Sequence, residues 1–248
     1  MNEYISKLIQ DDKLSISVDK SKTFGFQLGN KWVGKDKVLI SGPCSVESRD
    51  MIVDWSQELK EVGVDAIVCE GFEAGGHNGK EEITSMCLIP NVSENINIPV
   101  IAAGGIGSGK AMLAAFSLGA EGVQIGSRFV ASQECSAHTN FKDAVVESKE
   151  GDTMLSLKKL TAVRLLNNNF YQKVVEAENR GDSIEELREL LGRGRAKIGM
   201  FEGDLQEGEL EIGQVSSMIN EIKPVKEIID EIISDFKIEK GRINKIKF

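Results

Sequence analysis

One histidine follows a glycine-rich turn in the segment DAIVCEGFEAGGH at residues 65–77. The apolar run at 66–68 predicts a strand that stops at the carboxylate of Glu70. Parallel α/β enzymes build their sites where strands end in such loops. His77 is one of two histidines in the chain, and an imidazole titrates near neutral pH, as a general base must. Loop placement alone leaves this role and a hydrogen-bonded structural role equally open.

Two later glycine loops predict a binding site for a phosphate. AGGIGSG at 103–109 lies between an expected strand and an expected helix, and Gly126-Ser127 follows the next strand. Backbone N–H groups in such loops bind anions, and in parallel barrels the loops after two consecutive late strands commonly share one phosphate. The pair therefore favours a phosphate-bearing cofactor. A P-loop is disfavoured, because Ala111 stands where the magnesium-binding hydroxyl belongs.

The other titratable residues carry weaker signals. Glu70 and Glu73 could pair as acid and base, or more simply cap the strand end in solvent. His138 has no partner pattern and is expected to be structural. The four cysteines are widely spaced without a C-x-x-C pair, which fits reduced thiols better than disulfides or a metal site.

The composition favours a soluble, cytoplasmic enzyme that binds a small molecule. The chain has 248 residues, 41% of them hydrophobic, enough for one large domain or one domain with a helical appendage. A net charge of −9 argues against nucleic-acid binding. We find no apolar run of the ~18 residues that a membrane-spanning helix needs, and no signal peptide.

Strand and helix signals alternate in the first half of the chain. Strands are expected at 37–41, 65–69, 99–103 and 122–125, and helices at 47–62, 82–95 with a break at Pro90, and 110–118. Such alternation predicts an α/β fold with a parallel sheet and right-handed crossovers.

The second half is expected to be helical. Strand signals stop after residue 131, Ser183 and Glu186 form a capping box, and the acidic loop at 200–213 reads as solvated surface. Pro224 is expected to open a helix with Val225, Ile228, Ile229, Ile232 and Ile233 on one face. We therefore divide the chain into an irregular arm (1–35), a βα partial barrel (36–135), a helical domain (136–236) and a basic tail (237–248).

Four motifs over roughly 170 residues resemble the C-terminal part of a known family. They are VDAIVCEGFEAGGHNG at 64–79, IPVIAAGGIGSG at 98–109, AEGVQIGSRFVASQEC at 120–135 and EGDLQEGELEIGQ at 202–214. From about residue 63 to 233 the chain is similar to nitronate monooxygenases (2-nitropropane dioxygenases) and the related flavin-dependent enoyl-acyl-carrier-protein reductases. The resemblance implies a TIM-type barrel that binds FMN, with a helical second domain.

The resemblance also implies roles for individual residues. His77 would be the base that removes the α-proton of a nitroalkane, and Gly76 would approach the flavin. The cofactor-binding residues that it implies, several of them at the FMN phosphate, are Gly75, Gly76, Gly104, Gly105, Gln124, Ile125, Gly126 and Ser127.

The first part of the chain departs from that family. VLISGPCSVES at 38–48 resembles the first strand and helix of DAHP synthases, in which the cysteine of GPCS, here Cys44, ligates a metal. The K-P-R-T segment and the downstream metal-binding histidine of that synthase do not follow, so we expect neither its activity nor a metal site.

Four strands cannot close an eight-stranded barrel, and an open parallel edge favours pairing with another copy. We therefore expect a homo-oligomer, or a truncated or fused gene with impaired activity. The expected function is FMN-dependent oxidation of nitroalkanes or nitronates. The alternatives are an enoyl-acyl-carrier-protein reductase that uses NAD(P)H, and a non-catalytic fragment that acts only as a binding module.

Overall fold

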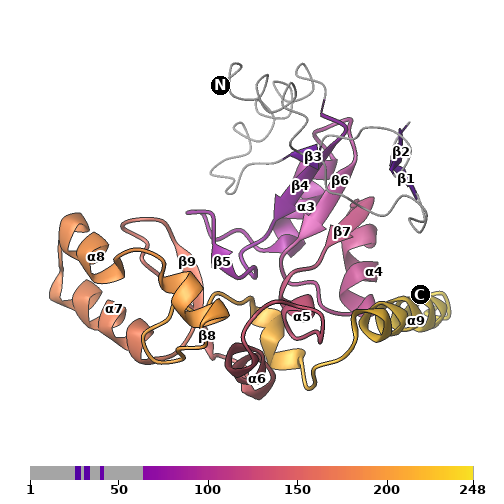
Figure 1. Ribbon diagram of the computed structural model, residues 1–248. Coiled ribbons are helices and arrows are strands. Elements are labelled where there is room, and N and C mark those ends of the chain that lie inside the picture. The colour runs from indigo at the N-terminus through magenta and orange to yellow at the C-terminus, as the bar shows by residue number, and fades with distance from the viewer. Residues whose placement is uncertain (1–25, 29–30, 34–39, 42–63, 248) are drawn as a thin grey trace. The chain divides into compact units, whose positions relative to one another are not determined.

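The computed structural model describes residues 26–28, 31–33, 40–41 and 64–247 (Figure 1). The chain forms two units, Met1–Val38 and Leu39–Phe248. In the first unit, β1 (Phe26–Leu28) and β2 (Lys31–Val33) pair antiparallel, within the arm that the sequence predicts to be irregular. The expected helix at 47–62, Cys44 and most of the DAHP-synthase-like segment lie outside the described residues.

A four-stranded parallel sheet confirms the predicted α/β class. Its order is β3 (Ile40–Ser41), β4 (Ala66–Glu70), β6 (Val100–Ala103) and β7 (Gly122–Gln124). The register sets Glu70 beside Ala103, and Ala103 beside Gln124. Because the strands are parallel, the loops that follow β4, β6 and β7 all leave the sheet at the same edge.

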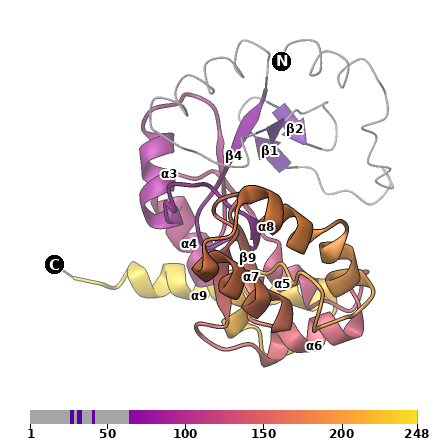
Figure 2. The ribbon, with the colours of Figure 1, turned by 90° about the vertical axis from the view of Figure 1, so that its left-hand side faces the viewer.

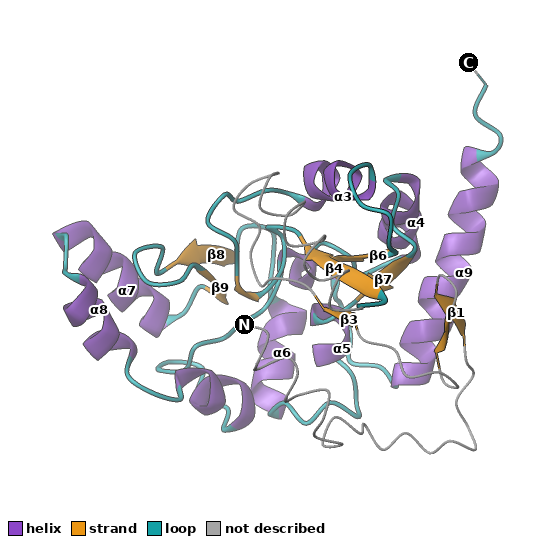
Figure 3. Cartoon of the chain, turned by 90° about the horizontal axis from the view of Figure 1, so that it is seen from above, coloured by secondary structure: helices purple, strands orange, loops and turns teal. Residues whose placement is uncertain are grey.

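Helices α3 (Ser85–Ser93) and α4 (Gly109–Ser117) lie on the same side of this sheet (Figure 3). The break expected at Pro90 is wrong, because α3 continues through it. Proline removes one amide donor, which leaves the carbonyl of Met86 without its helical partner. Met86 is 64% exposed, so water can take that bond.

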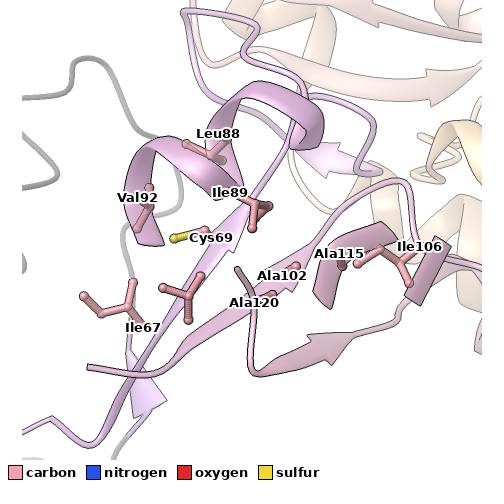
Figure 4. Packing of buried hydrophobic residues seen from close by; sticks show 10 residues of the cluster. Ile67, Cys69, Leu88, Ile89, Val92, Ala102, Ile106, Ala115 and Ala120 are labelled. Carbon is pink, nitrogen blue, oxygen red and sulfur yellow. The ribbon is translucent and has the colours of Figure 1, made fainter. Parts of the chain in front are cut away.

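Apolar side chains of α3 and of the parallel sheet pack together in a hydrophobic core (Figure 4). Ile67 and Cys69 of β4 pack with Leu88 and Ile89 of α3, and each is at most 1% exposed. Complete burial of such an aliphatic side chain stabilises the fold by about 1.5–3 kcal/mol. Burial also raises the pKa of the Cys69 thiol to about 12, so this cysteine is a packing residue.

A second sheet corrects the expectation that strands end at residue 131. β5 (Gly76–His77), β9 (Val163–Leu166) and β8 (Thr153–Ser156) form an antiparallel sheet in that order. All four residues of β9 are buried, so the strand shows no alternation, and Arg164 interrupts its apolar run. The sequence therefore lacks the pattern by which a half-buried strand is recognised.

The remaining elements are helices. They are α5 (Ser127–Val130), α6 (Thr139–Glu147), α7 (Asn169–Arg180), α8 (Ile184–Leu191), a π-helix η2 (Lys197–Phe201), a 3₁₀-helix η3 (Gln214–Met218) and α9 (Val225–Ile243). The predicted capping box is confirmed: Ser183 and Glu186 bond reciprocally at the start of α8.

Helix α9 packs beside α4 (Figures 1 and 2). Pro224 is its N-cap, as the sequence predicts, but its buried face is narrower than expected. Ile228 and Ile232 are buried, whereas Ile229 and Ile233 are each 43% exposed. The helix also runs into the stretch expected to be a solvated basic tail, where Glu239 is buried.

Candidate functional site

The loops after β4, β6 and β7 enclose a cavity of about 220 Å³ at the carboxyl edge of the parallel sheet. The sequence-predicted residues that line it are Gly75, Gly104, Gly105, Gln124, Gly126 and Ser127. The second half of the chain adds Met200, Glu211, Ile212 and Val215 to the lining. The lining thus combines glycine-rich loops with apolar side chains and carboxylates.

The glycines of this wall serve two different purposes. At Gly104, with φ +81°, an added Cβ would lie 2.6 Å from the carbonyl oxygen of Gly71, so this glycine is required by the protein itself. At Gly126 an added Cβ would meet no protein atom within 4 Å. Gly126 therefore leaves space that the described part of the chain does not fill.

Three residues of the cavity lining have unpaired backbone amides. Among the described residues, the N–H groups of Gly105, Gly126 and Ser127 donate to no partner. The Ser127 hydroxyl accepts a bond from the Gly213 amide at 2.9 Å, which leaves its own hydrogen free to donate. These donors fit an anion such as a phosphate, whose oxygens accept such bonds.

The loop between β4 and β5 is held by two buried side chains that the sequence analysis did not identify. Asn78, 5% exposed, donates from Nδ2 to the carbonyl oxygens of Ala74 at 3.0 Å and Gly76 at 3.1 Å. Arg164, 2% exposed, donates to the Phe72 carbonyl at 2.9 Å and lies over the Phe72 ring. Together they fix the turn that leads into His77.

His77 lies on β5, where it pairs with Val163 of β9, and its side chain is exposed. Neither His77 nor Gly76 belongs to the cavity wall itself. Ile125 packs against the hydrophobic core instead. The structure therefore gathers six of the nine predicted residues around one cavity, places His77 and Gly76 just beyond it, and turns the Ile125 side chain away.

Three glutamates line the cavity, and they differ in their hydrogen bonds and in what shifts their pKa values. Glu73 accepts bonds from the amide and hydroxyl of Ser85 at 3.0 Å and 3.1 Å, so it serves the start of α3. Burial raises the pKa of Glu70 and of Glu211, and His77 opposes the increase at Glu211. Glu70 and Glu73 therefore do not form the acid–base pair that the sequence allowed, because Glu73 is committed to the helix.

Comparison with known proteins identifies the family. The model of the nitronate monooxygenase family matches residues 40–235. The chain belongs to the nitronate monooxygenase family.

Individual relatives agree with this assignment. A probable nitronate monooxygenase of Staphylococcus aureus is 37% identical over an alignment of 162 residues that covers 59% of this chain and 45% of that protein. FabK from Thermotoga maritima superposes with a TM-score of 0.75 at 39% identity, over 84% of this chain and 63% of that one. A nitroalkane oxidase from Streptomyces ansochromogenes shares the fold, with a TM-score of 0.66 at 24% identity over 84% of this chain and 67% of that one. The chain thus spans about half the length of the curated relatives it matches.

The structure corrects the expectation for residues 200–213, some of which line the cavity. The acidic loop was expected to be solvated surface, yet Glu209, Leu210 and Ile212 are each at most 8% exposed. The alternation of acidic and apolar residues in GELEI, with period two, is the signal that could have indicated a half-buried extended segment.

Within the described ranges, no cluster of histidine, cysteine and carboxylate side chains could hold a metal ion. None of the helices that the structure describes is long and apolar enough to cross a membrane.

Proposed function

We propose that the cavity binds FMN and that this site oxidises nitroalkanes or nitronates. The observation that carries the proposal is the set of unpaired amides at Gly105, Gly126 and Ser127. The space next to Gly126 is empty, because an added Cβ there would meet no protein atom within 4 Å. These groups would hold the phosphate, with Gly104 and Gln124 shaping the same wall. The apolar side chains of Met200, Ile212 and Val215 would contact the ring system.

In this proposal His77 takes a proton from the carbon next to the nitro group. The C–H bond breaks, its electron pair stays on the substrate as the nitronate, and the proton moves to the imidazole. The redox chemistry would be supplied by the bound flavin, with oxygen as the acceptor. The clamp made by Asn78 and Arg164 would hold the loop that carries the base.

The experiment compares a neutral nitroalkane with its pre-formed nitronate in the parent and His77→Asn proteins. General-base catalysis contributes on the order of a hundredfold to ten-thousandfold. His77→Asn should lose that factor on the nitroalkane, keep most activity on the nitronate, and retain FMN. Equal losses on both substrates would contradict the role of His77 as base.

An enoyl-acyl-carrier-protein reductase that uses NAD(P)H is the second candidate. It is favoured by the similarity to FabK, an enoyl-acyl-carrier-protein reductase, at 39% identity. Oxidation of NAD(P)H with an enoyl thioester, without oxygen uptake on nitronates, would select it over the first candidate.

The third candidate is a binding module without catalysis. A purified protein that binds no flavin and turns over neither class of substrate would support it.

In any of these cases the parallel sheet would be part of a TIM-type barrel. Self-association stays a prediction, which sizing with light scattering checks.

A further inference from the structure

Glu211 lines the same cavity as Glu73 but is not tied to a helix as Glu73 is. Glu73 serves α3, but Glu211 accepts no hydrogen bond from the residues that the structure describes, although it is partly buried. Its carboxylate lies close to the main chain of Gly76: a Cβ added at Gly76 would be 2.6 Å from its Oε2. The glycine before His77 thus makes room for this carboxylate.

Strand β9 explains why these residues meet. Gly76 and His77 pair with Arg164 and Val163, at the start of β9. The segment that carries Glu211 bonds to the next two residues, through the bridge between Leu165 and Glu211 and the bond from the Leu166 amide to the Leu210 carbonyl. β8 pairs along the other edge of β9. β5 and Glu211 therefore follow one another along a single strand edge, which fixes their spacing.

The electrostatics of this segment couple Glu211 to His77. Burial raises the pKa of Glu211, and the charge of His77 lowers it. Two residues away, burial and then Glu211 raise the pKa of Glu209 to about 7, while Arg195 opposes this. Burial disfavours the ionised form of Glu211, and a positive charge on His77 favours it.

We propose that Glu211 is a positioning residue for His77, whose carboxylate stabilises the imidazolium that forms when the base takes a proton. The proposal rests on the proposed function of His77. The charge of Glu211 acts on the imidazole of His77, and the β9 edge holds the two residues near each other. Glu211 does not itself receive the proton, which still moves from carbon to imidazole. A negative charge beside a developing imidazolium lowers the energy of that transition state, as in other histidine–carboxylate pairs.

The kinetic test uses Glu211→Gln, which removes the charge and keeps the shape, and Glu211→Asp, which keeps the charge. Glu211→Gln should lower kcat on a neutral nitroalkane about tenfold, less than the hundredfold or more that the base itself contributes, and leave the nitronate rate unchanged. Glu211→Asp should recover most of the loss. Glu147→Gln, an exposed carboxylate on α6, is the matched control and should change neither rate. Equal losses on both substrates would overturn the proposal.

A second readout does not depend on activity. In protein with ¹³C-labelled glutamate carboxyls, the Glu211 signal is identified by its loss in Glu211→Gln. His77→Gln should raise the pKa of Glu211, because it removes the influence that lowers it. An unchanged Glu211 titration would refute the pairing. If the parent turns over neither substrate, the proposed function fails, and this titration still decides whether the two residues are coupled.

Discussion

Asn78 offers a direct perturbation of the loop that joins β4 to β5. Its side-chain amide donates to the carbonyl oxygens of Ala74 and Gly76, both buried residues, and its own backbone amide donates to Ala162 at 2.8 Å. Asn78→Ala deletes the two side-chain bonds and keeps the backbone bond. The change therefore loosens the turn without removing β5 from β9.

The magnitude follows from those two bonds. Each contributes about 1 kcal/mol, and leaving buried carbonyl oxygens without a donor adds to the cost, so we expect a loss of about 3 kcal/mol in the free energy of unfolding. For a chain of this size that lowers Tm by about 6–12 °C. Because Ala74 and Gly75 line the cavity, FMN must also re-order this loop, and its Kd should rise about tenfold.

Denaturant unfolding and flavin-fluorescence titration measure the two effects. Asn140→Ala is the matched control, because it removes one comparable bond, to the Gly203 carbonyl at 3.0 Å, on a residue outside the cavity wall. It should cost about 1 kcal/mol and leave FMN affinity unchanged. Equal stability losses in the two variants, or equal FMN affinities, would refute the reasoning.

Two further predictions concern stability. The pKa of Glu209 is about 7 in the fold, above its ordinary value of 4.5, so the folded chain holds this proton more tightly than the unfolded chain, and stability falls as the pH rises through that window. In the parent, the free energy of unfolding should therefore decline by on the order of 2 kcal/mol between pH 4.5 and 7, and Glu209→Gln should remove this decline. Denaturant unfolding at several pH values measures it, and an unchanged slope in the variant would contradict the prediction. Asp235 Oδ2 accepts a bond from the Lys110 amide at 2.9 Å and so ties α9 to the start of α4. Asp235→Ala should therefore cost about 1 kcal/mol of unfolding free energy, and a fully stable variant would show that this contact contributes nothing.

The sequence predicted the parallel sheet and the glycine wall because both depend on local signals. β4, β6 and β7 are short, largely apolar runs that lead into glycine-containing loops, and the register of the sheet then brings these loops together. β9 could not be predicted in this way, since a completely buried strand with Arg164 in it has neither alternation nor a continuous apolar run. Glu211 was missed because its position depends on a strand contact with Leu165, far from it in the chain.

The pairing of Asn78 with the loop was also beyond local patterns. Its partners lie two and four residues before it, but the turn that brings them together is held by Arg164 and by the pairing of Gly76 with β9, which are distant in the chain. The burial of Leu210 and Ile212 likewise depends on packing against α6 and β9, which are distant in the chain.

The central claim is that the wall containing Gly126 binds the FMN phosphate. Gly126→Val tests it most directly, because φ −104° and ψ −72° are open to a side chain and an added Cβ meets no protein atom. Gly241→Val on α9, where an added Cβ also meets none, is the matched control. Flavin-fluorescence titration should show an FMN Kd at least about tenfold weaker for Gly126→Val, with the stability of the flavin-free chain unchanged and the control like the parent. Equal FMN affinity in all three proteins, or no binding by the parent, would contradict the account.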